Sequence, residues 1–146
     1  MPATGPEFTR RVLMLGALSA CLRADSADDV WEVLSSMATG LGNGRTEEFL
    51  VGIDPKMPGY QDLRRNVAAL VAQADLQSSI ELVSNEGDDR KRKVEVDWLL
   101  RITGHDDVSG AANREEHVKA GFEKQGKHWR VISLEPIGFF APPRAR

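Results

Sequence analysis

The chain has 146 residues, of which 41% are hydrophobic and 28% charged, and its formal net charge is -3. This length suits one domain, the apolar content excludes wholesale disorder, and the mild acidity excludes general binding to nucleic-acid backbones. The single cysteine excludes an internal disulfide and any metal site built from several thiolates.

The first 25 residues are predicted to be an export signal and tether. Arg10 and Arg11 precede an apolar run over residues 12–20, which is too short to span a bilayer, and Cys21 follows it. Thr9, the arginine pair and the apolar residues after it resemble a twin-arginine signal. The run 18–21, Leu-Ser-Ala-Cys, resembles a lipobox, which would make Cys21 the acylated residue. We therefore expect export to a bacterial periplasm or cell envelope, with membrane contact only through this N-terminal anchor.

Two alternatives to the export signal stay open. The apolar run could remain attached as a helix that packs on the domain, and Glu7 within the charged region favours this slightly. Cys21 could instead be an ordinary buried thiol, because free cysteine behaves as a small hydrophobic residue.

Three helices are expected between residues 26 and 74. Ser26 and Asp29 have the spacing of a capping box, and an apolar stripe from Val30 to Leu41 follows them. A short helix is expected from Thr46 through Leu50. A third helix is indicated by apolar residues at helical intervals, namely Leu63, Val67, Leu70, Val71 and Ala74.

From Ser78 onward the apolar pattern changes to alternation, which predicts strands. Turn residues near positions 87, 104–110 and 126 divide this part into four strands around residues 80–82, 94–102, 118–122 and 129–140. Helices followed by an antiparallel meander make an α+β domain in which the helices cover one sheet face. Residues 26–140 are thus expected to form one domain, and residues 141–146 a loose tail.

The end of the chain carries a family resemblance. Gly126 is followed by Trp129, Arg130, Val131 and Ile132, which resembles the closing strand of the nuclear transport factor two-like superfamily. The short strand that this family places between its second and third helices is represented here only by residues 49–53. The resemblance implies a cone-shaped, cystatin-like roll, with helices packed on a strongly curved antiparallel sheet and a cavity at the open end. It does not imply one function, because isomerases, polyketide cyclases, dehydratases and dimerisation modules share this fold.

The resemblance and the alternation together predict an apolar ligand pocket. The residues expected to line it come from the long strand, its neighbour and two helices: Trp31, Leu34, Leu70, Val96, Trp98, Leu100, Val118 and Phe122. Because none of these side chains titrates, such a pocket could bind an apolar molecule but could not transfer a proton. The first hypothesis is therefore a non-catalytic module with no catalytic residue, which binds an apolar ligand or forms a homodimer through the outer sheet face around Leu99.

The alternative hypothesis is an isomerase, cyclase or dehydratase. Asp97 would be its general base, and Tyr60, the only tyrosine, or His117 would assist. Alternation places Asp97 on the face opposite Trp98, so we expect its carboxylate to lie outside the pocket. The direction in which Asp97 points therefore separates the two hypotheses.

No metal or cofactor is predicted. His105, Asp106 and Asp107 are consecutive turn residues that cannot easily converge on one ion, and no phosphate-binding loop or nucleophile motif is present. The basic run 90–93 follows acidic residues at 86, 88 and 89, so it indicates a solvated turn and no nucleic-acid site.

Overall fold

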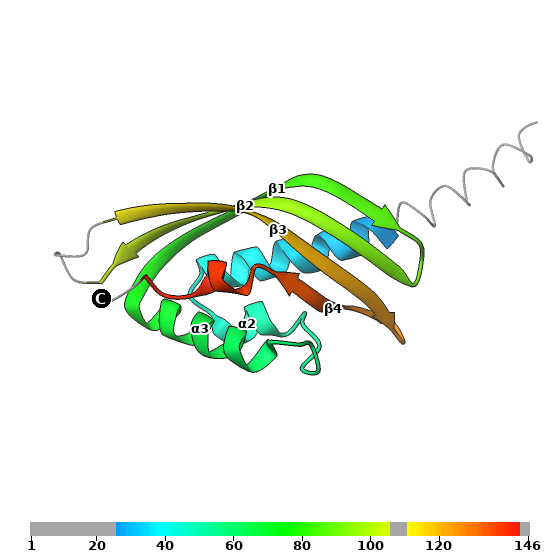
Figure 1. The fold of residues 1–146 in the computed structure, drawn as a ribbon, viewed down its shortest axis with the longest axis horizontal. Coiled ribbons are helices and arrows are strands. Elements are labelled where there is room, and N and C mark those ends of the chain that lie inside the picture. The colour runs from blue at the N-terminus through cyan, green and yellow to red at the C-terminus, as the bar shows by residue number, and fades with distance from the viewer. Residues whose placement is uncertain (1–25, 106–110, 144–146) are drawn as a thin grey trace, which may run out of the picture.

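The computed structural model describes residues 26–105 and 111–143. A helix over residues 26–42 is followed by the elements labelled in Figure 1: α2 (Thr46–Leu50), α3 (Tyr60–Gln73), β1 (Ala74–Gly87), β2 (Lys91–Gly104), β3 (Ala111–Gln125), β4 (His128–Glu135) and the 3-10 helix η1 (Ile137–Phe140). The predicted α+β class is therefore confirmed. Arg10, Arg11 and Cys21 of the predicted signal lie outside the described residues, as do residues 144–146 of the predicted tail. Within the described ranges, none of the helices combines the length and apolar character that a membrane span requires.

The helices form where the sequence predicts them. The first buries Val30, Leu34, Met37 and Leu41, which share one face at helical spacing. It ends near Gly44, whose φ of 70° is the left-handed conformation that commonly terminates helices. The third helix, α3, buries Leu63, Val67 and Leu70.

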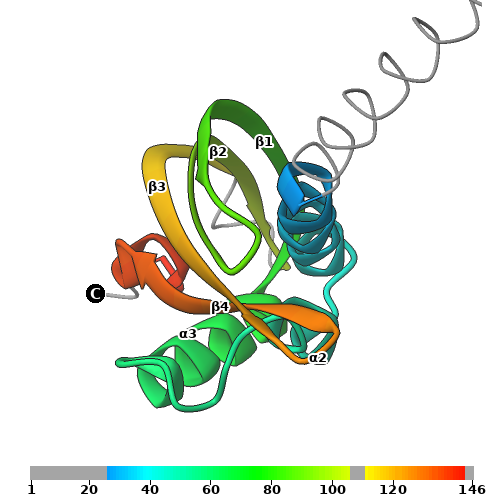
Figure 2. The same ribbon diagram turned by 90° about the vertical axis from the view of Figure 1, so that its right-hand side faces the viewer.

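The sheet is an antiparallel meander in the order β1-β2-β3-β4. Its first strand starts at Ala74, directly after α3 and earlier than the predicted Ser78. The register of β1 on β2 shifts between Leu82 and Ser84, which leaves Val83 as a bulge, and β3 shifts against β4 after Gly121. Such irregularities increase local twist, and Figure 2 shows β1–β3 curling beside the N-terminal helix, with α2 and α3 beneath. The strongly curved roll implied by the resemblance is confirmed.

The predicted strand from Trp129 through Phe140 is wrong at its end. Strand β4 stops at Glu135, because Pro136 has no N–H to donate to a sheet, and η1 follows. Upstream, the backbone N–H of Val131 donates to the Gly52 carbonyl at 2.8 Å, and the N–H of Asp54 donates to the Val131 carbonyl at 2.9 Å. This short parallel bridge covers part of the free edge of β4, and it lies at residues 49–53, the segment that the resemblance compares with the family's short strand.

The core lies between the inner sheet face and the helices. Along β2, the inward residues Val94, Val96, Trp98, Leu100 and Ile102 are all buried, which confirms the predicted alternation. The residues between them are exposed or half-buried. The faces of the central strand are therefore assigned as the sequence predicts.

Candidate functional site

The eight residues predicted to line an apolar pocket belong to one hydrophobic cluster. Seven of them are almost completely buried, and Trp31 is half-buried against the same cluster. Trp98 is 0% exposed and packs edge-on against Phe140, with ring centroids 5.0 Å apart, while Phe49 and Phe139 lie within 6.3 and 6.4 Å. These aromatic rings occupy the space beside Trp98, so at this position the cone interior is packed core.

The candidate catalytic residues do not form one site. Tyr60 is at the start of α3 and packs against the inner core, whereas Asp97 is on the outer sheet face. His117 lies directly opposite Asp97 in the β2–β3 register. The structure therefore joins Asp97 with His117 and separates both from Tyr60.

On the outer sheet face, His117 lies between two carboxylates. Its Nε2 is 2.6 Å from Glu95 Oε1, and its Nδ1 is 3.1 Å from Asp97 Oδ1. The hydrogen bond to Glu95, and secondarily that to Asp97, raises the pKa of His117, and the same contact lowers the pKa of Glu95. All three side chains contact solvent. This arrangement is a solvent-exposed charge cluster of the outer sheet face.

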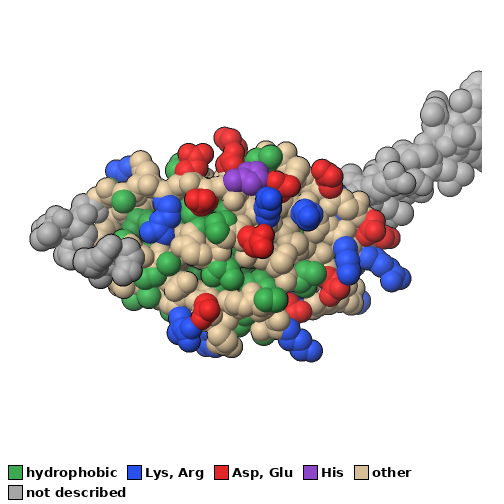
Figure 3. Space-filling view, viewed as in Figure 1, with side chains coloured by type: hydrophobic (Ala, Val, Ile, Leu, Met, Phe, Trp, Pro, Cys, Tyr) green, Lys and Arg blue, Asp and Glu red, His purple; other side chains and the backbone are tan. Residues whose placement is uncertain are grey.

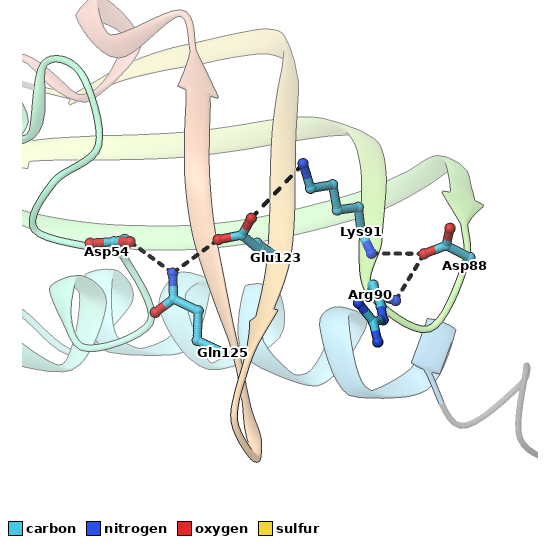
Figure 4. Close-up of polar contacts among 6 residues, drawn as sticks. All are labelled: Asp54, Asp88, Arg90, Lys91, Glu123 and Gln125. Atoms are coloured by element: carbon cyan, nitrogen blue, oxygen red, sulfur yellow. Dashed lines mark hydrogen bonds and ion pairs between the residues drawn. The ribbon is translucent and has the colours of Figure 1, made fainter.

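The predicted turn between the first two strands is confirmed, because β1 ends at Gly87 and β2 begins at Lys91, whereas most of the predicted turn at 104–110 lies outside the described residues. His105 Nε2 is 3.3 Å from Asp75 Oδ1, whereas Asp106 and Asp107 fall outside the described residues. Among the residues that are described, no group of three or more potential metal ligands occurs. In the basic turn, the Asp88 carboxylate accepts from the backbone N–H groups of Arg90 and Lys91 at 2.8 and 2.9 Å (Figure 4).

A cleft that the sequence did not predict lies between three segments that are far apart in the chain. It has a volume of about 490 Å³. Its walls are the N-terminal helix, the end of α2 with the residues after it, and the β3–β4 turn. The lining residues are Asp29, Glu32, Val33, Ser36, Met37, Glu48, Val51, Gly52, Lys127, His128, Trp129 and Arg130. Volumes of this order are typical of small-molecule sites.

Two glycines set the distance between the helical walls of the cleft. A Cβ atom on Gly52 would lie 2.8 Å from Val33 Cγ1, and one on Gly40 would lie 2.8 Å from Glu48 Cβ. Larger residues at either position would push the segments apart. Both glycines can be seen in the sequence, but only the fold shows which residue each of them faces.

Polar contacts hold the β3–β4 turn in place over the cleft. The side-chain amide of Gln125 donates to Asp54 Oδ2 at 2.8 Å (Figure 4), and the Arg130 guanidinium donates to the Val51 carbonyl at 2.9 Å. The pKa of Asp54 is lowered, first by a hydrogen bond from the Lys56 backbone and then by the one from Gln125. The wall that carries Trp129 is thus fixed to the loop before α3.

No protein-family model and no curated protein matches the sequence. A nuclear transport factor two-like superfamily protein from Salmonella enterica serovar Typhimurium aligns with a TM-score of 0.66 and 9% identity, covering 84% of this chain and 95% of that one. A type 2 hexachlorocyclohexane dehydrochlorinase, LinA, aligns with a TM-score of 0.65 and 12% identity, covering 79% and 86%. A Nostoc punctiforme protein of unknown function with a cystatin-like fold aligns at 0.55 and 14%, covering 73% and 85%.

The described residues therefore define an α+β, cystatin-like roll. More particularly, this is the nuclear transport factor two-like fold, as the sequence resemblance implies. Structural alignment at such low sequence identity establishes the fold, but it does not transfer the role of any residue from one protein to another.

Proposed function

We propose that this domain is a non-catalytic module that binds a small molecule. The observation that supports this most is the position of Asp97, the carboxylate best suited to act as a base, on the outer sheet face beside His117. A general base must reach the proton that it abstracts from a bound substrate. From Val94 to Ile102, the inner positions of β2 carry only apolar side chains. The fold neighbour LinA is a dehydrochlorinase by name, and a shared fold does not transfer that chemistry.

Turnover assays test the absence of catalysis. We expect an enolisable ketone, an epoxide and hexachlorocyclohexane to react no faster with the purified protein than in buffer. Asp97→Asn should leave these rates unchanged. A rate above background that disappears in Asp97→Asn, while Glu81→Gln retains it, would establish the enzyme alternative.

Self-association through the outer sheet face is a second candidate function. Leu99 lies on this face, is 42% exposed, and is flanked along β2 by Asp97 and Arg101. Beside Leu99, the outer face carries the acidic side chains of Glu95 and Asp97 and the basic side chain of Arg101. A mixture of signs, which Figure 3 also shows on the face that it displays, suits a self-complementary contact between two copies. Leu99→Asp should convert a dimer to a monomer in sedimentation velocity, whereas Val51→Asp, at an exposed position that lines the cleft, should not. A wild-type protein that sediments as a monomer at high concentration would exclude this function.

We also propose that the domain acts outside the cytoplasm of a bacterium, attached through an acylated Cys21. The support is the order of the Arg10–Arg11 pair, the apolar run and the cysteine. Replacing both arginines by lysine should retain the protein in the cytoplasm, because lysine lacks the planar guanidinium. Cys21→Ser should release the exported protein from the membrane fraction. Unchanged export in the first variant, or unchanged membrane association in the second, would refute the corresponding step.

A further inference from the structure

We propose that two copies of this domain associate face to face with their β2 strands antiparallel, so that Asp97 of each copy pairs with Arg101 of the other. This inference rests on the second candidate function, self-association through the outer sheet face, and assigns that contact its orientation and its charge pair. Three features of the outer face lead to it: an exposed leucine, a hollow beside this leucine, and the order of the charges along β2.

The exposed leucine is Leu99, in the outer row that crosses β1, β2 and β3. It is 42% exposed, and its neighbours in this row are Ser79 on β1 and Glu115 on β3. The described helices lie on the inner side of the curved sheet (Figure 2), so they do not shield this side chain. Contact with Leu99 of a second copy would remove both side chains from water, and this requires a two-fold axis that passes beside them.

A hollow of about 380 Å³ lies beside Leu99 on the same face. It is lined by Gln77, Ser78, Ser79, Leu99, Arg101 and Asn113, so it extends from Leu99 towards the end of β2. On the other side of Leu99, Asp97 and His117 project into solvent. An antiparallel copy would therefore lay its projecting side chains over the hollow of the first copy, and the first copy would do the same in return.

The order of the charges distinguishes two ways of pairing the faces. Along the outer positions of β2, the acidic Glu95 and Asp97 precede Leu99, and the basic Arg101 follows it. With the β2 strands antiparallel about Leu99, each Asp97 faces Arg101 of the other copy. With the strands parallel, Glu95, Asp97 and Arg101 would each face the same residue of the other copy. Like charges opposite one another disfavour association, so the antiparallel contact is favoured.

Both members of the proposed pair have hydrogen-bonding capacity left. Asp97 contacts His117 through Oδ1 at 3.1 Å, and a carboxylate has a second oxygen. Arg101 donates to Asn113 through Nη1 at 3.5 Å, and a guanidinium has further N–H donors. Each residue of the pair lies two positions from Leu99, which is about 7 Å along the strand, and packed sheets are about 10 Å apart. The two side chains can therefore meet between the sheets.

The same geometry brings one pair of like charges together. Glu115 lies in the row of Leu99, along which the two-fold axis runs, so it faces Glu115 of the other copy. In the parallel arrangement it would instead face Ser79, which is on the opposite side of Leu99 in the same row. Removal of the Glu115 charge therefore strengthens the contact only if the strands are antiparallel.

The experiment measures the dissociation constant of the dimer by sedimentation velocity over a concentration series of the full chain in reducing buffer. Asp97→Asn should weaken the dimer about tenfold, because the pair occurs twice, and Glu115→Gln should tighten it about threefold. Glu81→Gln, which also removes an exposed acid from the outer face, is the matched control. In the antiparallel dimer Glu81 faces Gln77, so this change should have little effect. Far-UV circular dichroism will show that each variant is folded.

Exchange of the two charges tests the pair itself. Asp97→Arg and Arg101→Asp should each sediment as a monomer, because each places like charges at both contacts. An equimolar mixture of the two variants should form a heterodimer, since every contact then joins opposite charges. The double variant Asp97→Arg/Arg101→Asp should dimerise within about tenfold of the wild type.

Each other result overturns a defined part of the inference. A wild-type chain that is monomeric at about 1 mM would overturn self-association and this inference together. If Leu99→Asp dissociates the dimer but Asp97→Asn leaves it equally tight or tighter, self-association stands and the antiparallel arrangement is wrong. Weakening by Glu81→Gln would point to the parallel arrangement, in which Glu81 faces His117. A mixture of the charge-reversal variants that remains monomeric would refute the pairing of Asp97 with Arg101.

Discussion

Trp98→Ala is expected to remove a large part of the free energy of unfolding. The side chain is 0% exposed, contacts three phenylalanine rings and donates a hydrogen bond to Ser78. Burying about 200 Å² of tryptophan at about 25 cal/mol/Å² contributes about 5 kcal/mol as an upper bound. Because alanine retains a little of this burial and the surrounding rings cannot fully close the cavity, we expect a loss of about 4 kcal/mol. That is a major fraction of the stability of a domain of this size.

Urea denaturation followed by far-UV circular dichroism measures this loss. With a denaturant dependence of about 2 kcal/mol/M, the midpoint should fall by about 2 M. Leu99→Ala, the next residue on the same strand but on the outer face, is the matched control and should change stability by less than about 0.5 kcal/mol. Trp98→Phe, which keeps a ring, should lose about 1–2 kcal/mol and remain measurable if the alanine variant does not fold. If Leu99→Ala costs as much as Trp98→Phe, the assignment of the two strand faces is refuted.

Three further changes test other parts of the structure. His117→Gln should lower the free energy of unfolding more at pH 5.5 than at pH 8.5. Because the pKa of His117 is raised in the folded state, its contribution to the free energy of unfolding is complete below the pKa of the unfolded state. That contribution is lost as the pH rises through the pKa of the folded state. Gly59→Ala should cost about 2 kcal/mol, because its φ of 83° disfavours a side chain and a Cβ atom there would overlap Ile137. Arg114→Met should cost about 2 kcal/mol, because its guanidinium donates to the carbonyls of Phe139 and Ala141 at 2.6 and 2.7 Å.

Controls for these three measurements come from the same chain. The His117 effect should vanish in a Glu95→Gln, Asp97→Asn background, and equal losses at both pH values would show that the carboxylates do not stabilise the imidazolium. Gly138→Ala, where nothing lies within 4 Å, should be nearly neutral in thermal or urea unfolding. For Arg114→Met, hydrogen exchange should rise first at the amide N–H groups of Phe139 and Ala141 and leave those of β2 protected. Uniform exchange in all strands would contradict a local role for Arg114.

The fold could be predicted from the sequence wherever local periodicity decides burial. Strand β2 shows this best, because its alternating residues from Val94 to Ile102 can be buried together only on one face. The end of β4 was predicted less well. Phe139 and Phe140 continued an apolar pattern, but Pro136 interrupts the ladder and turns both rings back onto Trp98. A pattern of hydrophobicity does not distinguish a buried strand from a buried 3-10 turn.

The candidate site was harder to predict, because it depends on distances between segments remote in sequence. The position of Asp97 outside the core followed from alternation alone. The cleft did not, because Glu32, Gly52 and Trp129 come from three elements whose approach is set by tertiary packing. In the sequence, Trp129 stands out only as part of the C-terminal motif that resembles the family. The residues beside it in the chain do not show that its indole N–H has no acceptor among the described residues.

The bulge at Val83 bears on the aggregation of this protein through the edge of its sheet. In the part of the chain that the structure describes, β1 pairs only with β2, so its other edge presents unused backbone donors and acceptors along a strand of 14 residues. Leu82 and Val83 are both 51% exposed on that strand. An unbroken edge of this length would be a template for aggregation, whereas a bulge divides it into shorter regular stretches and twists them out of line. Deletion of Val83 would restore a continuous edge beside Leu82 and is therefore expected to favour misassembly.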